Sequence, residues 1–218
     1  LTCLTSPGAG AIATLAVWGE RAWSITRAVF RTFEANQQLP ADPIAGKEGS
    51  GIQHADAALY SGRQVILTPL AQTTPALVQK ATDVWSAIGA QVLKMTAENH
   101  DSAFAAVSHL PHLLAFAYFG GVLGQPAGRD LLSLAGPGFR DFTRIAASDP
   151  TMWRDVLLAN REEVLKQSQR FRQSLDALEQ VMLAGNGAAL QELLRVASDG
   201  RRQWQMGTPR VPPVRVTI

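Results

Sequence analysis

A strand, a helix and a second strand, predicted close together near the middle of the chain, constrain the fold most. Gln64–Thr68 and Gln91–Met95 are short apolar runs typical of buried strands. Pro75–Ile88 has helical spacing between them, with proline in its first turn and Gly89 just past its end, which is the usual arrangement at helix termini. This order predicts a right-handed crossover unit of a parallel sheet.

After Met95 the sequence predicts helices only. Thr96 is suited to N-cap a helix that reaches about Phe119, and a loop over Gly120–Gly128 is expected next. Arg161–Leu183 is the clearest helix, because apolar residues recur in it at three- and four-residue steps. The remaining predicted helices are Phe139–Ala147, Pro150–Leu158 and Ala188–Ala197, and an extended tail is expected over Arg210–Ile218.

The front of the chain has a less regular pattern. It predicts a loop at Ser6–Gly10, a strand at Ile12–Trp18 and a helix at Arg21–Phe33. The residues of Asp42–Gly46 indicate a turn, and those of Gly51–Leu59 indicate one short helix. An α/β part is therefore expected before the helical part.

Composition argues against several classes of protein. No run of eighteen uncharged apolar residues occurs and no secretory signal pattern opens the chain, so neither a membrane span nor secretion is expected. Cys3 is the single cysteine, which excludes an internal disulfide and fits a reducing cytoplasm. The net charge is +2, but four of the basic residues lie in an acid-free tail: Arg201, Arg202, Arg210 and Arg215. The rest of the chain is therefore net negative, so a folded face that binds nucleic acid is not expected.

The segment His100–His112 combines features that are costly in a helix. It carries three histidines, an aspartate and a serine at the start of a long apolar run, and Pro111 is expected to interrupt the helix. Proline in a helix interior costs about 3 kcal/mol, and polar groups on a buried face need partners. Because sequences tend to break local rules where function demands it, this segment predicts a functional site.

Several separated motifs, in a shared order, resemble one family. From about Asp42 to Trp204 the chain is similar to the prephenate/arogenate dehydrogenases, which oxidise the precursor of tyrosine. The resemblance implies a Rossmann domain that holds NAD or NADP, a helical domain that forms a homodimer, and a small-molecule substrate, prephenate or arogenate, between them. The motifs are Pro43-Ile44-Ala45-Gly46 with Glu48, Ser50 and Gly51; Val65–Pro69; His100–His112; Gly138–Ala146; and Asp149-Pro150 with Trp153.

The fold expected from this resemblance is an α/β remnant of a Rossmann-like domain followed by an all-α dimerisation domain. The expected divisions are a foreign βα segment at 1–40, a partial nucleotide-binding domain at 41–96, a helical dimerisation and substrate domain at 97–204, and a tail at 205–218. The single cysteine offers no metal cluster, so no metal site is expected.

The resemblance also implies roles for single residues. Arg144 matches an arginine that binds a substrate carboxylate, which suits a planar guanidinium; the alternative is an arginine that closes a helix C-terminus. His112 matches a catalytic-site histidine that contacts substrate, and Ser108 belongs to the same substrate-binding motif. A satisfied helical histidine is the alternative for His112. Pro111 has no amide hydrogen to donate to the Val107 carbonyl, so this carbonyl is expected to be a hydrogen-bond acceptor in the pocket wall.

Four other residues have weaker assignments. Glu48 matches a residue that gates the substrate entrance, and its alternative is a solvated loop glutamate. Trp153 matches a tryptophan that lines the substrate pocket, and its alternative is ordinary helix packing. Asp141 and His109 are expected to support the residues that touch substrate.

Two departures from the family pattern matter more than these matches. The family carries a catalytic histidine immediately before Pro-Ile-Ala-Gly, where this chain has Asp42. A carboxylate still accepts a hydrogen bond from a hydroxyl, but it adds a negative charge beside a dianionic substrate, which should weaken binding. The glycine fingerprint for a dinucleotide is not recognisable either. Gly8–Ala13 fits GxGxxA by letter, but a β-like run follows where a helix should begin.

The first 35 residues resemble a different family. SPGAGAIATLAVWG followed by a helix is similar to the opening of the folate-binding N-terminal domain of tRNA-modification GTPases, although Ala9 stands where that family usually carries a basic residue. No GxxxxGK[ST] phosphate loop occurs in the sequence, so GTPase activity is not expected. We interpret this segment as a foreign βα unit in place of most of a Rossmann domain.

Three functional hypotheses fit the sequence. The first is NAD(P)-dependent oxidative decarboxylation of prephenate or arogenate, with Asp42 at the position of the catalytic histidine and Arg144 and His112 holding substrate. The second is a catalytically silent helical dimer that keeps the family scaffold. The third is a folate- or GTPase-related accessory piece, suggested by the first segment. The residues leave open both prephenate against arogenate and NAD against NADP.

Overall fold

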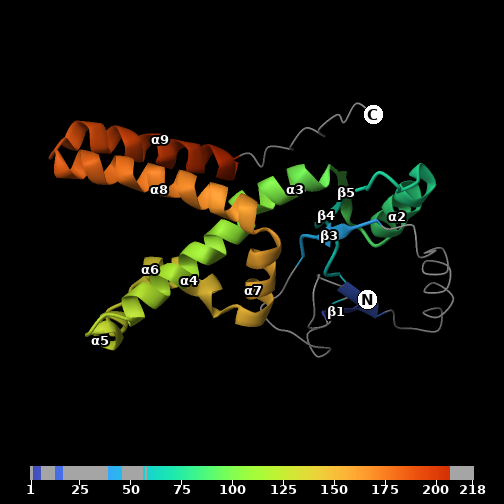
Figure 1. Cartoon of the computed structure of the whole chain (residues 1–218), viewed down its shortest axis with the longest axis horizontal. Helices are drawn as coiled ribbons and strands as arrows, with labels where there is room; N and C mark the ends of the chain where they lie inside the picture. The colour runs from blue at the N-terminus through green and yellow to red at the C-terminus, as the bar shows by residue number, and fades with distance from the viewer. Residues whose placement is uncertain (1, 6–12, 17–38, 46–55, 57, 207–218) are drawn as a thin grey trace.

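A computed structural model describes residues 2–5, 13–16, 39–45, 56 and 58–206 (Figure 1). It divides into a small α/β part and a larger helical part. The strands are β1 (Thr2–Thr5), β2 (Ala13–Ala16), β3 (Ala41–Pro43), β4 (Gln64–Leu67) and β5 (Gln91–Lys94). The helices are α2 (Pro75–Ala87), α3 (Ala97–Phe104), α4 (Leu110–Leu123), α5 (Gly128–Ser133), α6 (Pro137–Thr143), α7 (Pro150–Ala159), α8 (Arg161–Leu183) and α9 (Gly187–Met206), with a π-helical turn η2 (Ala105–His109) and a 3-10 helix η3 (Arg144–Ala147).

The predicted crossover unit is confirmed. β4 and β5 are parallel neighbours, and α2 connects them. α2 begins as expected, with Pro75 in its first turn and the Thr74 side chain accepting a hydrogen bond from the Leu77 amide. Just past its end, Gly89 has a φ of 87°, a left-handed conformation that glycine adopts without steric cost.

The predicted turn at Asp42–Gly46 is wrong in its first residues. Ala41–Pro43 form β3, which pairs antiparallel with β4 and places Asp42 opposite Ile66. Proline is tolerated there because β3 is an edge strand of the three-stranded sheet. The pairing fixes Asp42 near the carboxyl end of β4.

The core of the α/β part lies between the sheet and α2. Val65 and Leu67 of β4 are fully buried, and the Trp85 ring of α2 meets the Tyr60 ring edge to face, with centroids 5.3 Å apart. Ile66, whose side chain points to the other face of the sheet, is buried as well. β4 is therefore covered on both faces, which explains its continuous apolar sequence.

One long helical segment carries the histidine-rich motif. α3, η2 and α4 follow one another from Ala97 to Leu123, and the Thr96 side chain caps the start by accepting from the Asn99 amide. The prediction that Pro111 interrupts the helix is wrong. Pro111 falls in the first turn of α4, directly after the π-helical turn in which the Leu110 amide donates to the Ala105 carbonyl, and the helix continues through it. The helix also passes through Gly120, where a loop was expected to begin.

Ala97–Leu123 is long and apolar enough to cross a membrane by length and composition, the one helix of this kind in the described part of the chain. Only 6% of its most apolar window is buried. A membrane span was not expected because the apolar run is interrupted, but the serines, the proline and the three histidines of this helix leave its mean hydropathy high.

α8 and α9 form a helical hairpin at one end of the molecule (Figure 1). α8 has the predicted bounds, but α9 continues nine residues beyond the predicted end at Ala197. Arg201 and Arg202 therefore lie in a helix and not in a tail. Arg202 lies 3.6 Å from the Asp199 carboxylate, and the Arg201 guanidinium covers the Trp204 ring at 4.7 Å.

At the N-terminal end, β1 and β2 pair antiparallel. β2 falls inside the strand predicted at Ile12–Trp18, whereas the sequence pattern does not predict β1. The predicted helix Arg21–Phe33, most of the predicted helix Gly51–Leu59 and the predicted extended segment Arg210–Ile218 lie outside the described residues.

Candidate active site

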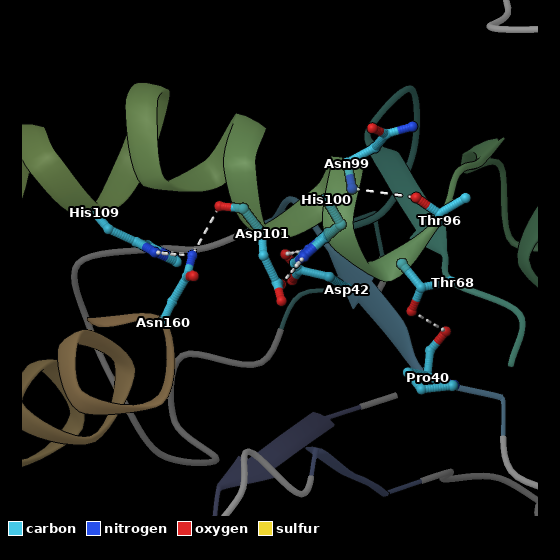
Figure 2. Close-up of polar contacts among 9 residues, drawn as sticks. All are labelled: Pro40, Asp42, Thr68, Thr96, Asn99, His100, Asp101, His109 and Asn160. Atoms are coloured by element: carbon cyan, nitrogen blue, oxygen red, sulfur yellow. Dashed lines mark hydrogen bonds and ion pairs between the residues drawn. The ribbon is translucent and has the colours of Figure 1, made fainter. Parts of the chain in front are cut away.

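A histidine held between two carboxylates lies where the α/β part meets the helical part (Figure 2). The Nε2 atom of His100, in α3, lies 3.1 Å from Oδ2 of Asp42 on β3. The Nδ1 atom lies 2.9 Å from Oδ1 of Asp101, and the ring stacks on Phe104 with centroids 4.6 Å apart. The side chains of His100 and Asp42 are 18% and 43% exposed, so the pair opens to solvent on the Asp42 side.

The Asp42–His100–Asp101 cluster favours the protonated imidazole. Hydrogen bonding to Asp42 is the main cause that raises the pKa of His100 above its ordinary value, and Asp101 adds to it, while partial burial acts in the opposite direction. Both ring nitrogens face a carboxylate oxygen, and only the protonated imidazole can donate from both. The cluster therefore favours a positive charge on His100 between two carboxylates.

Asn160 connects this cluster to the next histidine. Its Nδ2 atom donates to the Asp101 carbonyl at 2.8 Å and lies 3.2 Å from Nδ1 of His109 (Figure 2). Because an amide nitrogen only donates, His109 accepts through Nδ1 and carries its proton on Nε2. Burial lowers the pKa of His109, and the charge of His100 lowers it further. His109 is thus held as one neutral tautomer.

Residues that the family resemblance assigns to substrate gather further along the helix. The His112 ring stacks on the Trp153 ring of α7, with centroids 3.6 Å apart and planes 19° apart. Nδ1 of His112 donates to the Ser108 carbonyl at 2.9 Å, which leaves Nε2 as the acceptor of the neutral ring. Burial lowers the pKa of His112, and the charge of Arg144 in η3 lowers it further, so Arg144 acts electrostatically on His112.

Trp153 has a buried polar atom that the described residues do not satisfy. The residue is 7% exposed, and its indole Nε1 has no hydrogen-bond partner in the described part of the chain. A buried N–H without a partner costs about 1–3 kcal/mol. An acceptor from a ligand or a bound water would remove this cost.

Not all predicted site residues come together. Ser108, His112, Trp153 and Arg144 form one group, drawn from the motifs around η2, η3 and α7. Asp42 belongs to the other group, because it bonds to His100. Between the two groups along the helix lies His109, whose ring centroid is 6.2 Å from that of Trp153. Glu48 lies outside the described residues, and Asp141 is exposed on α6. His100 opens the predicted functional segment but has no individual role in the sequence pattern, and Asn160 has none.

The described residues supply only part of a dinucleotide site. In open α/β sheets, ligands bind beyond the carboxyl ends of the parallel strands, which here is the edge where Asp42 lies. The helix after β4 starts with a Thr74 cap and Pro75, not with a glycine-rich turn that could hold phosphates. Within the same residues, no group of three or more His, Cys, Asp or Glu side chains could hold a metal ion.

Comparisons with known proteins assign the two parts to two domains in the order of a two-domain dehydrogenase. Residues 23–94 match the family model for the nucleotide-binding domain of prephenate dehydrogenase, and residues 96–196 match the model for its dimerization domain. The chain belongs to the prephenate dehydrogenase family. The first match begins inside the segment that we interpreted as foreign, and the resemblance to tRNA-modification GTPases is not shown.

Relatives and solved structures agree with this assignment. The chain is 32% identical to cyclohexadienyl dehydrogenase of Zymomonas mobilis, and the match covers 82% of this chain and 63% of the relative. It is 30% identical to prephenate dehydrogenase of Bacillus subtilis, and this match covers 77% of this chain and 47% of the relative. It superposes on Aquifex aeolicus prephenate dehydrogenase in complex with hydroxyphenyl propionate and NAD+, with a TM-score of 0.72 and 36% identity. This superposition covers 86% of this chain and 64% of the Aquifex chain. The chain thus spans less than two thirds of these proteins.

Proposed function

We propose that this chain acts as a prephenate or arogenate dehydrogenase of tyrosine biosynthesis, with NAD or NADP as its cofactor. The proposal is supported by family membership and by the names of the relatives. The observation that carries it is the His112–Trp153 stack with Arg144 close enough to lower the pKa of His112. An aromatic wall, a neutral imidazole and a guanidinium suit a ring that bears carboxylates.

Each side chain has a defined task in this proposal. Arg144 pairs with a substrate carboxylate, Nε2 of His112 accepts a hydrogen bond, and Nε1 of Trp153 donates one. Asp42 accepts a hydrogen bond from the ring hydroxyl, which polarises it as the ring is oxidised and carbon dioxide leaves. A bound nicotinamide supplies the hydride acceptor.

The same proposal includes a homodimer in the cytoplasm. Many apolar side chains of the helical part are exposed in the single chain, among them Leu165 at 62%, Met182 at 63% and Leu183 at 79%. An apolar surface of this kind on a soluble protein needs a cover, and a twofold mate would supply it. Sedimentation at micromolar concentration should therefore give a dimer, and a stable monomer would contradict the arrangement.

A second candidate function is a catalytically silent dimer that keeps the scaffold. It is favoured by one observation, the aspartate at position 42 in place of the family's histidine. The two candidates differ in turnover. Purified protein supplied with prephenate or arogenate should reduce NAD or NADP, followed at the absorbance of the reduced nicotinamide, whereas the silent dimer gives no reduction with any of the four pairs.

Ligand binding tests the site without turnover. We expect hydroxyphenyl propionate, the compound bound in the Aquifex structure, to bind in calorimetry and Arg144→Ala to weaken binding at least tenfold, because a ligand carboxylate loses its partner. Arg140→Ala is the matched control, since Arg140 is exposed one helical turn earlier and its Nε donates to the Ala135 carbonyl. Equal affinity in all three proteins would refute the assignment of Arg144.

A further inference from the structure

The Asp42–His100 contact joins the two parts of the chain at the position where the family pattern has a single histidine. The two residues are 58 positions apart in the sequence, and β3 and α3 bring them within 3.1 Å. His100 engages Oδ2 of Asp42, while Oδ1 has no hydrogen-bond partner among the described residues. One oxygen of the carboxylate is thus held by the imidazole, and the other can accept a hydrogen bond.

We propose that His100 is a positioning residue that compensates the charge of Asp42, so that the Asp42–His100 pair replaces the single histidine of the family pattern. This inference rests on the proposed function, because it assigns the free oxygen of Asp42 to the ring hydroxyl of the substrate. His100 does not touch the substrate. It orients the carboxylate through Oδ2 and cancels one of the two negative charges that the substrate would otherwise meet.

The charge balance predicts how the pair depends on pH. With protonated His100 the Asp42–His100–Asp101 cluster carries a net charge of −1, and with neutral His100 it carries −2. The hydrogen bond to Asp42 and the second carboxylate raise the pKa of His100. The charge of His100 also acts on His109, but burial lowers the pKa of His109, so His109 loses its proton at lower pH. Affinity for an anionic ligand should therefore be high below the pKa of His100 and fall as pH rises through it.

Titration of the imidazoles tests the pair without any ligand. Nuclear magnetic resonance should show His100, assigned by the signal that disappears in His100→Gln, with a pKa above about 6.5, and Asp42→Asn should lower it. Glu98→Gln is the matched control, because it removes an exposed carboxylate from the same helix without touching His100. A His100 that titrates at or below its ordinary value in the wild-type protein overturns the proposal.

Ligand binding tests the role of the charge. Hydroxyphenyl propionate should bind the wild-type protein about tenfold more weakly above the pKa of His100 than below it, the effect of one uncompensated charge near an anion. His100→Gln, which keeps an amide donor but not the charge, should bind at the weaker level at every pH. Equal affinity of the wild-type protein and His100→Gln across the pH range overturns the compensating role of His100. If Arg144→Ala still weakens binding in the same assay, the proposed function stands. Insensitivity to Arg144→Ala counts against the proposed function instead.

Discussion

Replacing Asn160 with alanine should destabilise the protein and change the titration of a histidine on another helix. Asn160 precedes α8, but its side chain makes no capping hydrogen bond to that helix. The side-chain amide instead donates to the Asp101 carbonyl at 2.8 Å and to Nδ1 of His109 at 3.2 Å. The lost bond to half-buried His109 costs about 1 kcal/mol, and the bond to the more exposed carbonyl about half as much. Asn160→Ala should therefore lower the free energy of unfolding by about 1.5 kcal/mol, or the Tm by about 3–6 °C.

The histidine gives the second readout. In the wild-type protein, Asn160 donates to the neutral form of His109 and so favours it over the charged form. Removing the donor should raise the pKa of His109 toward its ordinary value. Urea unfolding and resonance titration measure the two effects. Asn186→Ala is the control, because the Asn186 side chain caps α9 by accepting from the Ala189 amide, and its loss should cost about 1 kcal/mol with no change at His109. An unchanged pKa of His109 in Asn160→Ala would refute the contact.

The remaining predictions concern the core, pH and the cofactor. Leu67→Ala should lower the free energy of unfolding by about 3 kcal/mol in urea titrations, because Leu67 is fully buried. A raised pKa contributes stability at low pH that is lost as pH rises through it, so His100→Gln should cost most below about pH 6.5. The pKa of His112 is lowered, so His112→Gln should reduce the loss of stability as pH falls below about 6.5. Because no glycine fingerprint is recognisable, calorimetry should give Kd values for NAD and NADP above about 10 µM.

Elements with strong local signals could be predicted from the sequence. α8 has the predicted bounds, and the parallel pair β4 and β5 with α2 between them follows from apolar runs, Pro75 and Gly89. Elements without such signals could not. β3 is three residues long and exists because it pairs with β4, and the length of α9 depends on a glycine, Gly200, that a helix tolerates at a cost of about 1 kcal/mol.

The residues of the candidate site also divide into those that the sequence indicates and those that it does not. Ser108, His112, Trp153 and Arg144 were named because each sits in a motif of the family, and the fold groups them. His100 lies in such a motif too, but its significance depends on a partner 58 positions away. The partners of Asn160 are 59 and 51 positions away. A single sequence contains no signal for contacts at these separations, since they follow from the packing of separate elements.

The π-helical turn η2 has a consequence for the spacing of the site. Its hydrogen bond from the Leu110 amide to the Ala105 carbonyl encloses one residue more than an α-helical turn does. Each added residue rotates the following helix by about 100°, which lets His100 face β3 while His112 faces α7. Deleting one residue of this turn would rotate α4 relative to α3, so that His100 and His112 could not both keep their partners on β3 and α7. An insertion or deletion within these five residues should therefore be tolerated less well than one in the loops between α4 and α7.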